Sequence, residues 1–168
     1  MTELGSAPVP ELSPEDHVRG PEGAPLVIEY ADFECPFCAA LEPRLAQMPV
    51  RRAFRHFPVR SSHPRAWAAA CAAEAADLQG SFWEMHDLLF ADQGRLEDPH
   101  LWRRAEQLGL DVERFEADRR SDALGARVRR DFTSGVRAGV VTTPTVFSGD
   151  SVLSGQISEN ALAVLLRT

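Results

Sequence analysis

The sequence predicts one α/β domain, with a mixed central sheet, helices on both faces and an all-helical insert. Three observations carry this prediction. Residues 26–57 contain two short apolar runs joined by a helical segment, the pattern of a right-handed crossover between parallel strands. Residues 63–138 carry their apolar side chains at helical spacing. Two short strand-like runs and a last helix then follow, which adds an antiparallel hairpin to the sheet.

The first crossover surrounds a pair of cysteines. Residues 26–30 (LVIEY) are mostly apolar and predict a buried strand. Residues 35–38 (CPFC) then open a helix that runs to about residue 48. Pro36 suits the first turn because its missing N–H leaves no helical hydrogen bond unmade. Residues 52–57 predict the second strand.

Local signals divide the stretch 63–138 into five helices. Ser81 and Glu84 form a capping-box pattern at the start of the second helix. Asp111 is placed to cap the fourth helix. The fifth helix has an apolar residue at every fourth position: Leu124, Val128, Phe132 and Val136.

After this block the pattern returns to strands. Residues 145–147 and 152–153 flank the turn-forming run 148–151 (SGDS), which predicts a β-hairpin. Ser158 is placed to cap a closing helix.

These elements predict a division of the chain into three parts. Residues 17–62 and 139–168 form the sheet-containing core, and residues 63–138 form the helical insert. Residues 1–16 are rich in proline and glutamate and predict a flexible segment.

The composition excludes several classes of function. All 18 basic residues are arginine, so a P-loop lysine and a Schiff-base lysine are both excluded. The net charge of −7 disfavours nucleic acid as a partner, because a phosphate-binding domain carries the opposite charge. No apolar run approaches the roughly 20 residues of a membrane span. Residues 1–25 contain five prolines and no apolar core, so we expect no secretory signal and a cytoplasmic location.

The position of Cys35 and Cys38 indicates redox chemistry. A helix N-terminus carries a partial positive charge and free backbone N–H groups, which favour the thiolate of Cys35 over the thiol. The thiolate is the form that attacks a disulfide. Cys38 lies one turn deeper and can resolve the resulting mixed disulfide. A Cys pair in a reducing compartment is more often catalytic or metal-binding than structural.

The alternative interpretation of the cysteines is a metal site. A structural zinc needs four ligands, and the third cysteine, Cys71, falls on an apolar helical stripe where it predicts a small buried side chain. His56 and His63 have no spacing that requires a ligand role, so we predict no metal. A metal bound between two copies of the chain stays open as a third, weaker hypothesis.

Four segments carry a resemblance to a known family. Residues 28–38 (IEYADFECPFC), 54–58 (FRHFP), 80–86 (GSFWEMH) and 143–145 (TPT) are similar, in this order, to blocks of DsbA-like thioredoxin-fold proteins. The chain resembles most the bacterial branch with stand-alone members and members fused to sodium/proton antiporters. The resemblance implies a thioredoxin fold with a helical insert, and thiol–disulfide exchange without a cofactor. Classical members act outside the cytoplasm, unlike the location predicted above.

The resemblance also implies roles for three further residues. Thr143-Pro144 matches the family's cis-proline, which would expose the Thr143 backbone for strand-like pairing with a substrate; a trans proline at the start of an edge strand is the alternative. Glu29 occupies the place of a buried acid that could move the Cys38 proton. A Glu29 side chain that faces solvent at a strand end is equally compatible with the sequence.

Two groups of side chains near the cysteines need interpretation. We expect Phe33 and Phe37 to form an apolar lip for substrate, with Pro36 and Phe37 among the binding residues. Five arginines fall between residues 51 and 65 without an acid, and we interpret them as a solvated charged face.

The leading hypothesis is therefore a thiol–disulfide oxidoreductase acting on a thiol- or disulfide-containing protein or small thiol. Cys35 attacks, Cys38 resolves, and the direction of electron flow and the redox partner stay open. The alternative hypothesis is a redox-sensing or partner-binding module of the same fold that does not turn over.

Overall fold

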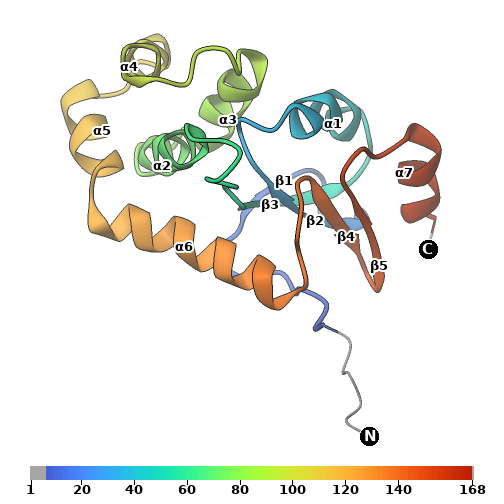
Figure 1. Cartoon of the computed structure of the whole chain (residues 1–168). Helices are drawn as coiled ribbons and strands as arrows, with labels where there is room; N and C mark the ends of the chain where they lie inside the picture. Colours follow the sequence, from blue (N-terminus) through green and yellow to red (C-terminus); the bar gives the residue numbers. More distant parts are fainter. Residues whose placement is uncertain (1–6, 168) are drawn as a thin grey trace, which may run out of the picture.

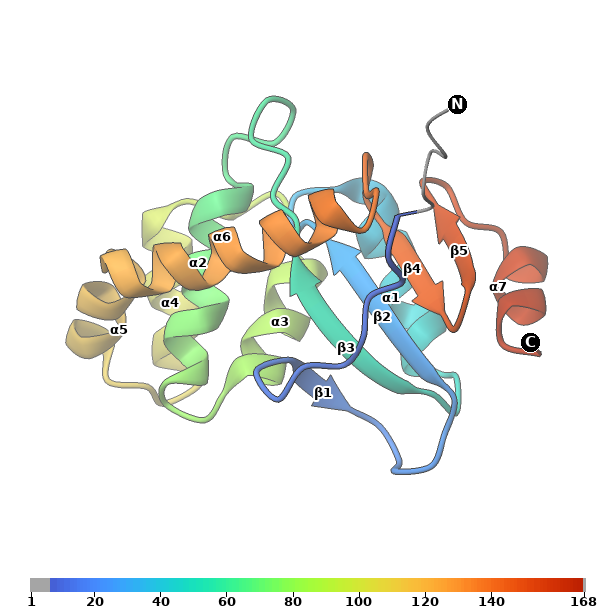
Figure 2. The ribbon, with the colours of Figure 1, turned by 90° about the horizontal axis from the view of Figure 1, so that it is seen from below.

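The computed structural model describes residues 7–167, which form a five-stranded mixed sheet with helices on both faces and a helical block at one end (Figures 1 and 2). The strand order is β1-β3-β2-β4-β5. The strands are β1 (His17–Arg19), β2 (Leu26–Ala31), β3 (Arg51–His56), β4 (Thr145–Ser148) and β5 (Ser151–Ser154).

Seven helices are described. They are α1 (Pro36–Ala46), α2 (Ala66–Asp77), α3 (Phe82–Ala91), α4 (Asp98–Gln107), α5 (Val112–Arg119), α6 (Asp122–Arg137) and α7 (Glu159–Leu165). Helices α2 to α6 all lie in the segment 63–138 that was expected to be helical, as five separate helices. Among residues 7–167, no helix has both the length and the apolar character needed to cross a bilayer.

The sheet topology confirms the predicted crossover and hairpin. Strands β2 and β3 are parallel and joined through α1, whereas β4 pairs antiparallel with both β2 and β5. Gly149, in the two-residue turn between β4 and β5, has a positive φ of 53°, a conformation that glycine adopts without steric cost. The central position of β2 places the loop after its carboxyl end, which carries the cysteines, in the middle of the molecule.

Alternation along β2 assigns its side chains to two different layers. Val27 packs with residues of α1 and α7 on one face of the sheet. Ile28 and Tyr30 point to the other face, where the C-terminal half of α6 lies (Figure 2). Because the side-chain period of a strand is two, Glu29 shares the face of Val27 and points toward α1.

Strand β1 was not predicted. It has three half-buried residues and pairs antiparallel with β3 at the edge of the sheet, from His17 opposite Phe54 to Arg19 opposite Arg52. A run of three residues is too short to show alternation in the sequence.

Part of the N-terminal segment expected to be flexible is bound to the sheet. Arg55 donates from Nε and Nη2 to the Asp16 carboxylate, at 2.8 Å each, and from Nη2 to the Glu11 carbonyl oxygen at 2.6 Å. Residues 7–16 are described, and residues 1–6 lie outside the described residues.

Helix caps confirm two of the three predictions made for them. Asp111 accepts from the Arg114 N–H and Ser158 from the Ala161 N–H. The capping box at Ser81 is wrong: Ser81 occupies the N-cap position of α3 but its side chain makes no capping hydrogen bond. Its backbone, at ψ 37°, departs from the extended conformation in which an N-cap side chain usually reaches the first turn.

Two glycines of α6 give a matched test of how closely this helix packs on the sheet. A Cβ atom at Gly135 would lie 2.7 Å from the Phe57 ring and 2.9 Å from the Tyr30 ring. At Gly125 the nearest atom is the mobile end of Arg129, at 3.3 Å. We predict that Gly135→Ala lowers the free energy of unfolding by about 1–3 kcal/mol through overpacking. Gly125→Ala should leave it unchanged or raise it by up to about 1 kcal/mol.

Urea unfolding of both variants measures the difference. Equal stability of Gly135→Ala and Gly125→Ala would contradict the close approach of α6 to β2.

Candidate active site

The two cysteines lie where β2 passes into α1. Cys35 is the N-cap residue of α1, with extended φ and ψ of −73° and 121°, and Pro36 is the first helical residue, as predicted. The Cys35 N–H donates to the Asp32 carbonyl oxygen at 3.0 Å, which closes the turn between strand and helix. Cys38 follows in the first turn of α1 and is fully buried. Both thiols are free.

The electrostatics of the two thiols are opposite. The pKa of Cys35 is lowered to about 6, chiefly by a hydrogen bond from the Cys38 thiol. The Thr143 hydroxyl and the backbone N–H groups of Cys38 and Phe37 add to this effect, while burial opposes it. The pKa of Cys38 is raised well above its ordinary value, first by burial and then by its hydrogen bond to Cys35. At neutral pH, Cys35 is therefore the nucleophilic thiolate and Cys38 stays a thiol.

Cys35 lies at the floor of a groove rather than on an open surface. Its exposed fraction is 3%, and it lines a groove of about 340 Å³ together with Phe37, His63 and Thr143. The Cys35 Sγ lies 3.4 Å from the Thr143 carbonyl oxygen. This one contact requires the protonated thiol, and the several donors to the sulfur outweigh it in the thiolate.

Of the predicted substrate-binding residues, two are buried and two are exposed beside Cys35. The Thr143-Pro144 peptide bond is cis, as expected, and both residues are buried, with Thr143 lining the groove. Pro36 and Phe37 are exposed beside Cys35, Phe37 with 46% of its surface. Phe33 does not belong to a lip, contrary to expectation. It is 1% exposed and stacks on Phe54 at 5.3 Å between ring centres, because it turns into the core that the sheet shares with the insert.

Glu29 is fully buried beneath α1, which excludes the solvent-facing alternative. Its Oε2 accepts from Arg52 Nε at 2.9 Å and from Arg52 Nη2 at 2.7 Å. Arg52 also pairs with Glu42 of α1, and His86 Nε2 lies 3.5 Å from the same Glu42 carboxylate. Burial raises the pKa of Glu29 despite Arg52, and Glu29 Oε1 has no hydrogen-bond partner among the described residues.

The interpretation of residues 51–65 as a solvated charged face is wrong for two of its arginines. Arg52 is 2% exposed and bound to two carboxylates, and Arg55 is 6% exposed and bound to Asp16. The alternation of side chains along β3 explains this outcome. Arg52 and Phe54 share one face of the strand, Arg55 points to the other, and both faces are covered. Arg65 is partly exposed and pairs with Glu34 and Glu97.

Cys71 is the small buried side chain that the sequence predicted. It packs with Ala70, Val128 and the partly buried Trp67, away from the groove, and burial raises its pKa to about 11.

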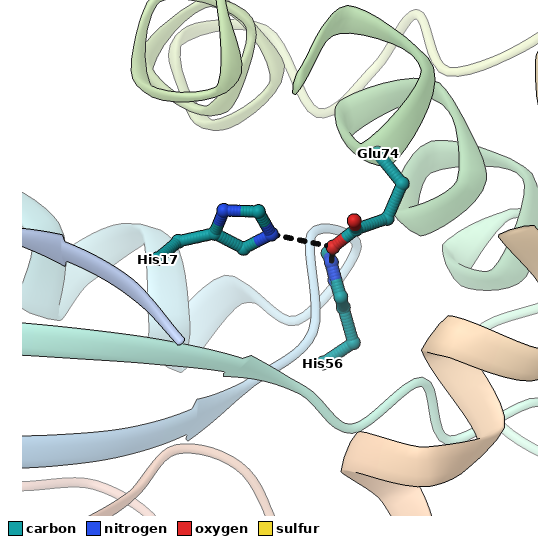
Figure 3. A group of neighbouring side chains, drawn as sticks. All are labelled: His17, His56 and Glu74. Atoms are coloured by element: carbon teal, nitrogen blue, oxygen red, sulfur yellow. Dashed lines mark hydrogen bonds and ion pairs between the residues drawn. The ribbon is translucent and has the colours of Figure 1, made fainter. Parts of the chain in front are cut away.

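One group of side chains has the chemistry of metal ligands. His17 of β1, His56 of β3 and Glu74 of α2 bring their ligand atoms within 4.8 Å of one another (Figure 3). Both histidines already approach the same oxygen: each Nε2 lies 2.7 Å from Glu74 Oε1. The three residues join the edge strand β1, its neighbour β3 and helix α2 of the insert by hydrogen bonds, which would have to be given up to bind an ion.

Sequence reasoning missed most of the polar contacts around the cysteines. The Glu29–Arg52–Glu42 group and the Asp32–His63 pair bring together residues 10 to 31 positions apart. A signal was present for Arg52, since it shares one face of its strand with the apolar Phe54, and an arginine on a buried face is almost always paired. His63 carries no comparable pattern, because it lies in the irregular loop between β3 and α2.

The hydrogen bond between the two thiols gives a direct test. Cys38 is the largest cause of the lowered Cys35 pKa. We predict that Cys38→Ala moves the pH midpoint of Cys35 alkylation by iodoacetamide from about 6 toward the ordinary thiol value, whereas Cys71→Ala leaves it unchanged. A midpoint that does not move in Cys38→Ala would contradict this and assign the low pKa to Thr143 and the backbone N–H groups at the start of α1.

Known proteins are similar to this chain in sequence and in fold. A family model described as Thioredoxin matches residues 12–167. The chain is 47% identical over 148 residues to the Na⁺/H⁺ antiporter NhaA 3 of Salinispora tropica, covering 83% of this chain and 22% of that protein. It is 43% identical over 164 residues to NhaA 1 of Salinispora arenicola, covering 92% and 25%. The chain thus spans about a quarter of the length of these curated relatives.

Solved structures with the same fold superpose on this chain. A thioredoxin-like oxidoreductase from Silicibacter pomeroyi superposes with a TM-score of 0.81 at 26% identity, covering 92% of each chain. Oxidised BdbD from Bacillus subtilis superposes with a TM-score of 0.76 at 20% identity, covering 89% of this chain and 90% of that one, which supports the fold alone. Because the family model covers residues 12–167, most of the chain, the chain belongs to the thioredoxin family.

Proposed function

We propose that this protein is a thiol–disulfide oxidoreductase that exchanges disulfides with protein or small thiol substrates through Cys35 and Cys38. The observation that carries the proposal is the opposite ionisation of two neighbouring thiols, with the ionised one in a groove. A nucleophile and a protonated resolving thiol are the two groups that the exchange needs.

The exchange proceeds in two steps. The Cys35 thiolate attacks one sulfur of a substrate disulfide, so a mixed disulfide forms and the other substrate sulfur leaves with the electron pair. Cys38 then loses its proton and attacks Cys35, which releases the second substrate sulfur as a thiolate and leaves a Cys35–Cys38 disulfide. The substrate is reduced and the protein is oxidised by two electrons. The reverse sequence oxidises a dithiol substrate.

Thr143, Pro144, Pro36 and Phe37 are proposed to hold the substrate around Cys35. The Thr143 backbone lies beside the sulfur, at 3.4 Å from its carbonyl oxygen, at the point where β4 begins. An extended substrate segment can pair with backbone groups there in the manner of an added strand. The exposed Phe37 ring lines the same groove and offers apolar contact there.

Glu29 is proposed to receive the Cys38 proton during the second step. Its raised pKa makes the carboxylate a better base than an ordinary glutamate, and its charge already raises the pKa of Cys38. The unpartnered Glu29 Oε1 has a free lone pair for the proton.

A second candidate is a redox-sensing module without turnover, as the sequence already suggested. It is favoured by the relatives, in which the matching segment is about a quarter of a longer antiporter. A domain within a transporter can report its oxidation state to a partner surface without processing a substrate. The cytoplasmic location stays a prediction.

Insulin reduction with dithiothreitol separates the two candidates. We predict multiple turnovers for the unaltered protein and for Cys71→Ala, and none for Cys35→Ser, which lacks the nucleophile. Cys38→Ser should accumulate a mixed disulfide with the substrate, visible by mass spectrometry without reductant. Stoichiometric oxidation of the cysteine pair without turnover at high protein concentration would favour the sensor and contradict the enzyme.

A further inference from the structure

A histidine from outside the CPFC motif lies in the cysteine groove. His63 belongs to the loop between β3 and α2, and it lines the groove of about 340 Å³ that also contains Cys35 and Thr143. The two residues between the cysteines, Pro36 and Phe37, carry no titratable group. His63 therefore brings an imidazole to this groove, and imidazole is the side chain that most often serves as a general acid or base.

The His63 ring is oriented by a buried carboxylate. Its Nδ1 lies 2.7 Å from Oδ2 of Asp32, whose side chain is fully buried. An ionised carboxylate accepts only, so Nδ1 carries the hydrogen of this bond. A carboxylate bonded to Nδ1 of a histidine fixes the tautomer of the ring. The histidine can then accept or donate a proton through Nε2.

Asp32 joins the histidine to the nucleophile through a rigid set of bonds. Its Oδ2 also accepts from the Val59 N–H at 2.9 Å, and its Oδ1 accepts from the Glu34 N–H at 2.8 Å. Its carbonyl oxygen accepts from the Cys35 N–H. The His63 N–H in turn donates to the Val59 carbonyl oxygen at 2.8 Å. One residue thus holds both the backbone of Cys35 and the loop that carries His63.

The remaining ring nitrogen is available. Among residues 7–167, His63 Nε2 has no hydrogen-bond partner, and 21% of the side chain is exposed. This differs from His56 and His86, whose rings are enclosed in the core with 1% and 0% of their surface exposed. A hydrogen bond at one ring nitrogen and an open second nitrogen, at the rim of a nucleophile's groove, is the arrangement of a general acid–base.

We propose that His63, oriented by Asp32, is the general acid–base that exchanges a proton with the substrate sulfur during disulfide exchange at Cys35. This inference rests on the proposed function and adds to it a second acid–base group beside Glu29.

The proposed step balances in protons and electrons. As the Cys35 thiolate bonds to one substrate sulfur, the substrate S–S bond breaks and its electron pair moves to the other sulfur. The Nε2–H of protonated His63 gives its proton to this departing sulfur, which leaves as a thiol, and His63 becomes neutral. In the reverse direction, neutral Nε2 removes the proton of an attacking substrate thiol. Asp32 keeps its hydrogen bond to Nδ1 in both directions and stabilises the imidazolium.

Dependence on the leaving thiol tests this role. An aliphatic disulfide such as oxidised glutathione releases a thiol of ordinary pKa, which gains from protonation as it departs. An aromatic disulfide such as dithiobis(nitrobenzoate) releases a strongly acidic thiol that needs no proton. We predict that His63→Gln slows reduction of oxidised glutathione by about tenfold or more and leaves the rate with dithiobis(nitrobenzoate) within about twofold.

Three controls separate chemistry from folding. Glutamine can keep the hydrogen bond to Asp32, so the loop is retained, and the iodoacetamide rate of Cys35 should be unchanged. Imidazole added to His63→Ala should restore part of the rate with glutathione disulfide. His100→Gln, on α4 away from the groove, should react with both disulfides like the unaltered protein.

The outcomes distinguish this inference from the function on which it rests. Equal rates of His63→Gln and the unaltered protein with both disulfides, or equal losses with both, would overturn the role of His63 alone. An unaltered protein that reacts with neither disulfide would overturn the proposed function itself.

Discussion

The hydrogen bond between the Cys38 thiol and the Cys35 sulfur is the interaction on which the chemistry of this protein depends. It forms because the two residues are one helical turn apart and because the strand–turn–helix junction fixes Cys35 at the N-cap of α1. It is asymmetric because Cys38 is buried and Cys35 faces a groove. The Cys38 thiol therefore stabilises the thiolate of Cys35, and the two cysteines could not exchange their roles.

The charged side chains buried beneath α1 contribute more to the difference between the two cysteines than to the free energy of folding. Taking Glu29, Arg52 and Glu42 out of water costs several kcal/mol per ion, and their mutual attraction roughly offsets that cost. Arg52 is shared between two carboxylates, so it does not neutralise both, and the pKa of Glu29 stays raised. The result is a negative group behind Cys38 that can take up a proton in a site from which water is excluded.

Local features of the sequence predicted the parts of the structure that local physics determines. The crossover at residues 26–57, the five helices of the insert, the hairpin turn at Gly149 and the cap at Asp111 each follow from periodicity or turn chemistry within a few residues. The placement of Cys35 and Cys38 at the start of α1 was predicted for the same reason, because the cysteine spacing and the start of the helix are neighbours in the chain. The family resemblance added the cis bond before Pro144.

The predictions that were wrong concern side chains whose position depends on contacts with residues distant in the sequence. Arg52 was expected in solvent because its partner Glu29 belongs to another strand, 23 residues earlier. Phe33 was expected at the surface because nothing nearby shows that Phe54 and the insert cover it. The Asp32–His63 pair spans 31 residues and two loops, and loops carry no periodicity from which an orientation could be predicted.

The dependence of the reduction potential of the Cys35–Cys38 pair on pH tests the central claim most directly, since it requires both a reversible disulfide and an ionised Cys35. Reduction takes up two electrons and two protons below the pKa of Cys35, but only one proton above it. The account predicts a slope of about 59 mV per pH unit that falls to about 30 mV near pH 6. A slope that stays near 59 mV up to about pH 8.5, or a cysteine pair that forms no disulfide with glutathione, would contradict it.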